Sequence, residues 1–266
     1  MKKELDFGLN FHQTFPPSPA YIGRILSIAD GQKKSAREIS DITGIPQGES
    51  SGKVVPHLKY AAYMGLITPD ITAPVLTPLG QVVQAEDHAC SEEITQWLMH
   101  RNLTSVQGAP MWHFICRDLL HNNHGTLSTE YLTNQMINKF GTAKFAPVLT
   151  TYQELFAIGY LQPIKTAGAI SIQPQRIQRE FLYLYAYELL SEWDARYPAT
   201  SEITAEECTA LASATCFGLQ ENLWFEVLEQ LSTMQICRIN KQLAPYTIVR
   251  LSGKDSLITK LYSLLI

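Results

Sequence analysis

Near the start of the chain, the residues best suited to chemistry are a histidine and a threonine set between aromatic side chains. Residues 11–16 read Phe-His-Gln-Thr-Phe-Pro. An imidazole can exchange a proton near neutral pH, and both His12 and Thr14 could meet a phosphate or a reacting group. We therefore take His12 and Thr14 as the candidate catalytic residues. The alternative is a short extended segment before the first helix in which Phe11 and Phe15 pack against the core.

A second group of polar and basic residues lies where a helix is expected to begin. Hydroxyl groups, lysines and the free backbone amides of a helix N-terminus are the usual partners of a phosphate backbone. The expected DNA contacts are Arg24 on the preceding helix and, around the start of this helix, Ser50, Ser51, Lys53, His57, Lys59 and Tyr60. The alternative is an ordinary capped helix with a solvated polar face.

Other patterns in the sequence give weaker evidence for a functional site. Cys116, His121 and His124 have the spacing C-x4-H-x2-H, which is not a standard zinc spacing, and we expect no resident metal there. Histidines near the end of a helix are favoured by its dipole, which is the simpler interpretation. The chain contains no P-loop, no GxGxxG and no GxSxG sequence.

The first quarter of the chain predicts three helices followed by a β-hairpin. Apolar spacing predicts a helix from about residue 20 to 29, and Ser35 with Glu38 forms a capping box before the second. The third should begin near residues 51–53 and end at Gly65. Strands are predicted at 66–68 and 75–79. This order is typical of a winged helix-turn-helix.

Two further segments repeat this order, and the joint between helix and strand recurs around Gly65, Gly159 and Ile236. The alternative is that such joints recur by chance. The predicted fold is mainly α with small β-hairpins (α+β), with tandem winged helix-turn-helix modules around a helical middle. We expect a winged helix at 1–85, a helical middle with a second winged-helix-like unit at 86–200, and a third unit at 201–266. The remaining helices are predicted at 92–100, 111–121, 128–140, 145–158, 175–197, 204–214 and 220–231, and the remaining strands at 160–161, 169–172, 236–239 and 246–251.

Composition sets the broad class. The 266 residues are 45% hydrophobic and 17% charged, with a net charge of −4, which is typical of a globular protein and not of a non-specific polyanion binder. Residues 1–66 nevertheless hold eight Lys and Arg against six Asp and Glu. The five cysteines form no CxxC pair, so we expect buried thiols. The first residues lack the apolar core of a secretory signal, and we expect a cytoplasmic protein.

Several short motifs together resemble a known family. The His12–Phe15 segment resembles that family's His-Glu-Thr-Phe opening, and further motifs follow in the family's order over roughly residues 7–250. The family is encoded beside DNA phosphorothioation genes, and one branch supplies the DNA-nicking component of single-stranded phosphorothioation antiphage systems. The further motifs are Gly65-Leu66-Ile67, Leu76-Thr77-Pro78-Leu79-Gly80, Trp97-Leu98-Met99-His100 and Met111-Trp112-His113-Phe114.

The resemblance implies a DNA-binding, strand-nicking protein that acts with a cysteine desulfurase, an ATP-pyrophosphatase-like enzyme and an ATPase. If the chain is an enzyme, it is then a nicking endonuclease, and hydrolysis would need an activated water, usually with Mg²⁺. His12 would be the base and Lys53 the phosphate clamp. One position departs from the pattern, because Gln13 replaces the family's glutamate.

A second function class competes with the first. Winged-helix repeats on a chain of net negative charge also serve as transcription regulators or as adaptors that recruit partner proteins without catalysis. A cysteine desulfurase gene beside this one would favour the first class.

Overall fold

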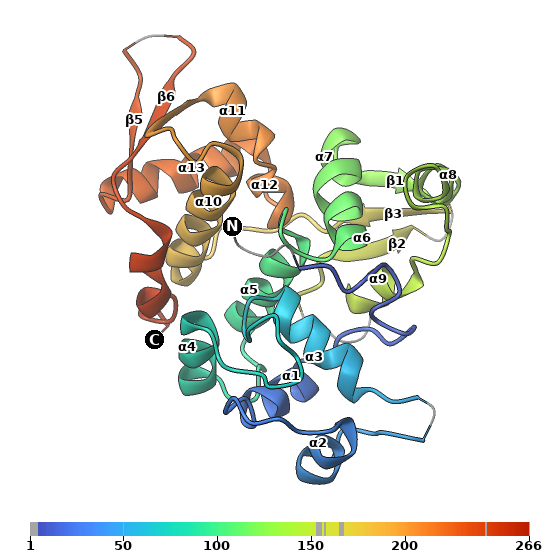
Figure 1. Cartoon of the computed structure of the whole chain (residues 1–266). Coiled ribbons are helices and arrows are strands. Elements are labelled where there is room, and N and C mark those ends of the chain that lie inside the picture. Colours follow the sequence, from blue (N-terminus) through green and yellow to red (C-terminus); the bar gives the residue numbers. More distant parts are fainter. Residues whose placement is uncertain are drawn as a thin grey trace.

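The structure is a computed structural model, and it describes residues 5–49, 51–152, 156, 158–164, 168–242 and 244–265. It is an α+β fold with two small antiparallel sheets, as the sequence predicts. Figure 1 shows three lobes that meet around the helix α5 (Glu93–Thr104). The N-terminal lobe is drawn in blue and cyan, the second in green and yellow, and the third in orange and red.

The first lobe contains the predicted capping box. Ser35 accepts a hydrogen bond from the backbone of Glu38, whose carboxylate in turn accepts from the backbone of Ser35. The predicted third helix is confirmed. The chain turns out of it at Gly65, whose φ of +70° suits a residue without a side chain. The helices of this lobe are α1 (Pro19–Leu26), α2 (Ala36–Thr43) and α3 (Val54–Tyr63).

The predicted second strand of this lobe is shorter than expected. Only Val75 and Leu76 pair, with Asp30 and Ile67 respectively. The Thr77 hydroxyl then accepts from the backbone N–H of Gly80, and Pro78 begins the helix α4 (Pro78–Glu86). The strand prediction for 77–79 was therefore wrong, because a capping threonine followed by proline starts a helix.

The second lobe begins with a continuous helical stretch whose middle turns are π-helical. The strand pair predicted at 160–161 and 169–172 is confirmed. The end of the predicted 145–158 helix includes residues 153–155 and 157, which lie outside the described part. The elements are α6 (Pro110–His113), η1 (Phe114–Leu119), α7 (Leu120–Asn122), β1 (Thr126–Ser128), α8 (Thr129–Phe140), α9 (Ala146–Thr150), β2 (Leu161–Ile164) and β3 (Ala169–Ile172).

The third lobe contains the second predicted capping box, formed by Thr204 and Glu207. The helix predicted at 175–197 is shorter than expected, because residues before Arg179 are not helical. The elements are η4 (Arg179–Phe181), α10 (Leu182–Arg196), β4 (Glu202–Thr204), α11 (Ala205–Ala210), α12 (Ser213–Cys216), α13 (Glu221–Thr233), β5 (Cys237–Asn240), β6 (Thr247–Arg250) and η5 (Lys254–Lys260).

The three lobes repeat one topology. In both sheets the last strand lies in the middle, in the orders β1-β3-β2 and β4-β6-β5. The isolated bridges of the first lobe follow the same order, because the segment around Val75 and Leu76 pairs with Asp30 on one side and Ile67 on the other. Along the chain, each lobe thus has the order helix, strand, helices, strand, strand.

The helix α5 is buried on every side. All its residues from Ile94 to Thr104 are buried, so it presents no solvated face. Buried polar groups must find protein partners. Asn102 donates to the carbonyl of Met64 in the first lobe, and Thr95 bonds to the Tyr262 hydroxyl near the C-terminus.

Two arginines and two glutamates join the lobes next to α5. Glu188 on α10 accepts from Arg101 Nε at 2.5 Å and from Arg117 Nη1 of η1 at 2.6 Å. Glu192 accepts from Arg101 Nη2 at 3.0 Å, and the Ser213 hydroxyl also donates to Glu188. Despite burial, which opposes the charge, the two arginines hold the pKa of Glu188 at about 2.

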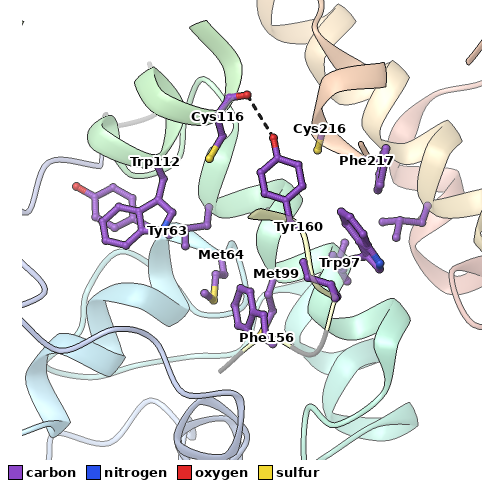
Figure 2. Close-up of a cluster of buried hydrophobic side chains, with 14 of the residues drawn as sticks. Tyr63, Met64, Trp97, Met99, Trp112, Cys116, Phe156, Tyr160, Cys216 and Phe217 are labelled. Atoms are coloured by element: carbon purple, nitrogen blue, oxygen red, sulfur yellow. Dashed lines mark hydrogen bonds between the residues drawn. The ribbon is translucent and has the colours of Figure 1, made fainter. Parts of the chain in front are cut away.

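Aromatic side chains fill the space between the lobes. Trp97, Trp112 and Tyr160 are almost fully buried and come from three different parts of the chain. Figure 2 shows Tyr160 donating to the carbonyl of Cys116 across this core. All five cysteines are buried and free, as predicted. Of the described helices, none is both long and apolar enough to cross a membrane.

Replacing Glu188 by Gln should destabilise the fold by about 3–5 kcal/mol, because it leaves Arg117 as a buried cation without its counter-charge. Chemical denaturation monitored by tryptophan fluorescence measures the loss. Glu229→Gln removes the carboxylate of an exposed ion pair with Lys241 and should cost less than about 1 kcal/mol. Equal losses for the two variants would contradict a central role for the buried network.

Candidate nucleic-acid interface

His12 lies in a tight turn that packs between the first two lobes. The turn is closed by backbone hydrogen bonds from Gln13 to Asn10 and from Phe15 to His12. Gln13 and Thr14 have positive φ angles of 47° and 72°. A β-branched residue rarely adopts this conformation, so surrounding contacts must hold Thr14 in place. The predicted alternative of an extended segment is therefore wrong for residues 11–14.

The ring of His12 is fixed in one tautomer. Its side chain is 2% exposed and packs edge-on against Phe11 and Trp112. The backbone N–H of Thr14 donates to His12 Nδ1 at 2.9 Å, so the proton of the neutral ring is on Nε2. Burial lowers the pKa of His12 below its usual value. Nε2 has no hydrogen-bond partner among the described residues, and His12 therefore offers a donor and not a base.

The turn and α9 form a groove with a volume of about 430 Å³. Figure 1 shows the dark blue N-terminal segment beside α9. His12 and Thr14 both line this groove, so the structure brings the two predicted catalytic residues together. The described lining residues are Asn10, His12, Thr14, Pro16, Lys144, Ala146, Pro147 and Thr150.

Lys144 and Asn10 are the functional candidates that the sequence did not reveal. Lys144 lies two residues before α9 and 132 residues after His12, and no local pattern distinguishes it from other exposed lysines. Only the packing of the turn against the second lobe brings Lys144 into the groove that His12 lines. The repeat of the helix-strand joint was the one signal that pointed to the second lobe.

Lys53 and Arg24 both lie against the ring of Tyr21. The Lys53 ammonium is 5.6 Å from the ring centres of both Phe15 and Tyr21, and the Arg24 guanidinium is 5.8 Å from the Tyr21 ring. Arg24 also donates to the carbonyl of Thr43 at the end of α2. Phe15 is next in sequence to Pro16, which lines the groove. The cluster of Lys53, Arg24 and their aromatic partners therefore begins beside the groove.

The other predicted contacts differ in their exposure. Lys59 is half-buried, with its ammonium 5.7 Å from the Phe7 ring, and Ser51 is exposed before α3. Ser50 lies outside the described residues.

His57 and Tyr60 are buried and serve packing. His57 Nδ1 donates to the carbonyl of Lys53, and His57 Nε2 accepts from the backbone of Ser18. The Tyr60 hydroxyl donates to the carbonyl of Phe15. Both side chains hold the N-terminal segment on α3, and in this conformation neither reaches a DNA backbone. The helical periodicity of α3 could have indicated this, because His57 lies three residues after the buried Val54 and Tyr60 three residues after His57.

The described residues contain no group of three or more His, Cys, Asp or Glu side chains that could hold a metal ion. The groove at His12 is also poor in the ligands that Mg²⁺ prefers, because no carboxylate is among its lining residues. A larger cavity of about 950 Å³ lies between α3, α5, α10 and η5. Its most buried polar residues, including Arg101 and Asn102, already bond within the central network.

His57 should remain neutral well below the pH at which a free imidazole is protonated. Burial lowers its pKa to about 4. The unfolded chain takes up this proton near pH 6.5, so the contribution of His57 to stability should be complete above pH 6.5 and decline as the pH falls toward 4. Imidazole nitrogen shifts measured by NMR test this directly. A His57→Leu variant identifies the signal, and a titration midpoint near 6.5 would contradict the buried tautomer.

The comparisons with known proteins concern the whole fold. No family model and no curated protein matches the chain. Two solved structures do, described as "SspB crystal structure" and "Magnesium ion-bound SspB crystal structure", with TM-scores of 0.73 and 0.72. Each alignment covers 97% of this chain and 89% of that chain at 14% sequence identity. The chain therefore has the fold of the SspB crystal structures over nearly its whole length.

Proposed function

We propose that this chain is the DNA-binding and strand-nicking component of a DNA phosphorothioation system in antiphage defence. The observation that carries the proposal is the match to SspB over 97% of the chain, which agrees with the family resemblance of the His12 motif. The partners we propose are DNA, a cysteine desulfurase, an ATP-pyrophosphatase-like enzyme and an ATPase, all in the cytoplasm.

We assign the three lobes as winged helix-turn-helix modules, divided at 1–85, 86–200 and 201–266. The support is their common order of helix, strand, helices and two strands, with the last strand in the middle of each sheet. In such modules the helix before the hairpin enters the major groove and neighbouring residues contact phosphates. In the first lobe this helix is α3, and Lys53 lies at its N-terminus.

Lys53, Lys59, Arg24 and Ser51 remain our proposed DNA contacts. Lys53 and Arg24 gain support because both lie against the ring of Tyr21, which places two cations close together as ligands for a phosphate backbone. His57 and Tyr60 are left out because both are buried.

For His12 we propose a role different from the one expected from the sequence. A neutral ring that carries its proton on Nε2 donates a hydrogen bond and cannot accept a proton from water at that atom. His12 thus positions the bound strand, with Thr14 holding its ring through the backbone N–H. Hydrolysis would need an activated water, usually with Mg²⁺, and the described lining of the groove offers such an ion no carboxylate.

A non-catalytic adaptor or regulator is the second candidate. The net charge of −4, the glutamine at position 13 and the lack of carboxylates in the groove favour it. Under this proposal the winged-helix repeats bind DNA or partner proteins without cutting.

Conversion of supercoiled plasmid to open circle, with and without Mg²⁺, separates the two candidates. We expect the wild-type protein to nick. His12→Leu should reduce the rate about 100-fold, the usual cost of a lost donor in a reacting complex. His12→Gln should retain much of the rate, because its amide can still donate. If His12→Gln is as inactive as His12→Leu while both fold normally, His12 acts as a base and the donor assignment is wrong. No nicking by the wild type under any condition would favour the adaptor.

Replacing Lys53 by Ala should weaken DNA binding on all sequences and lower the slope of log K against log salt by about 1, the signature of one lost phosphate contact. Lys59→Ala should have a smaller effect. Fluorescence anisotropy with a labelled duplex at several salt concentrations measures both. Lys241→Ala in the third lobe, which breaks only an exposed ion pair, is the control. Unchanged affinity and slope for Lys53→Ala would exclude α3 as the DNA-binding helix.

A further inference from the structure

Part of the groove beside His12 is lined by apolar residues. Pro16 lies on the N-terminal side, and Ala146 and Pro147 lie on the side of α9. Proline rings present hydrocarbon faces without a backbone N–H. A volume of about 430 Å³ falls in the range of sites that enclose a small molecule.

The polar side chains among the described lining residues are Asn10, His12, Thr14, Lys144 and Thr150. His12 Nε2–H is a donor whose direction is fixed by the bond from the Thr14 backbone to Nδ1. Asn10 also lines the groove and offers an amide donor and a carbonyl acceptor from one side chain. A donor beside an amide is the combination that reads the edge of a nucleobase.

A phosphate group fits this groove less well than a base does. Lys144 is the one cation among the described lining residues, and it is exposed, while a phosphate seated on the two prolines would lose hydration without compensation. An unstacked base, in contrast, gains by leaving water for apolar walls. The exposed position of Lys144 suits the phosphate attached to that base.

We infer that this groove is a seat for a single unstacked nucleobase, held between Pro16 and Pro147, with its edge bonded to His12 and Asn10. The inference rests on the proposal that the chain handles DNA, and it specifies how one strand is engaged. Because the seat is shared by the N-terminal turn and α9, it requires the first and second lobes to keep their relative positions (Figure 1).

Free nucleotides test the seat independently of DNA binding. The four 2′-deoxynucleoside 5′-monophosphates are titrated at millimolar concentration against full-length protein with ¹⁵N-labelled histidine, and the His12 imidazole signals are followed by NMR. We expect at least one nucleotide to shift the Nε2–H signal, and inorganic phosphate to leave it unchanged. An equal shift with inorganic phosphate would contradict the proposed base-binding site and indicate an anion site instead.

A blocking variant tests the seat with DNA. Ala146 is exposed at the first position of α9, so Ala146→Trp fills the groove without disturbing buried packing. A strand carrying 2-aminopurine should become more fluorescent on binding to the wild type, because the base leaves its stack, and the variant should abolish this rise. Strand affinity should fall about tenfold, as expected for the loss of one base contact. Ala199→Trp, at an exposed loop residue in the third lobe, is the matched control.

The outcomes separate the seat from the proposed function. If DNA binds but neither Ala146→Trp nor the nucleotides have an effect, the seat is excluded and the proposed function is retained. If nucleotides shift His12 but no DNA binds, the seat is supported and the proposed function fails. His12→Gln, which keeps a donor, should retain nucleotide binding, whereas His12→Leu should lose it while circular dichroism shows that the variant is folded.

Discussion

The burial of α5 is the constraint on which the remaining structure depends. A helix enclosed on every side cannot leave polar side chains unpaired, and several of them find their partners in neighbouring lobes. Arg101 reaches Glu188 of the third lobe, and Asn102 reaches Met64 of the first. His100 bonds to the Tyr152 hydroxyl in the second lobe and to the Cys216 carbonyl in the third. The same bonds that satisfy α5 therefore fix the lobes relative to one another.

The groove at His12 is a consequence of that arrangement. Phe11 is buried among Tyr60, Tyr63 and Trp112, which come from the first and second lobes. The N-terminal turn is thus held at the boundary between these lobes, where α9 forms the opposite wall. Loss of the ionic network would then affect the groove at a distance, because its two walls belong to different lobes whose relative position depends on α5.

The sequence predicts local structure here better than it predicts the site. The capping boxes at Ser35 and Thr204 and the stop at Gly65 depend on neighbours within a few residues, and they are confirmed. The strand predicted through Leu79 was wrong because Thr77 and Pro78 carry a helix-start signal that the apolar alternation obscured.

The site depends on contacts that no local pattern encodes. His12 and Thr14 were identified by their types, but the tautomer of His12 comes from a turn with two positive φ angles. His57 and Tyr60 have the chemistry of DNA contacts and are nevertheless buried, because the N-terminal segment covers them. Lys144 joins the groove only through the fold.

The charge of the protein bears on how such a chain could hold DNA. A net charge of −4 rules out strong attraction by the molecule as a whole, so binding has to rest on local features. The proposed DNA contacts include only a few cations, and two of them, Lys53 and Arg24, each lie against an aromatic ring. Under the proposed function, so few phosphate contacts release few counterions, and we expect a shallow salt dependence. The proposed base site beside His12 would in addition favour a strand whose bases are already unstacked.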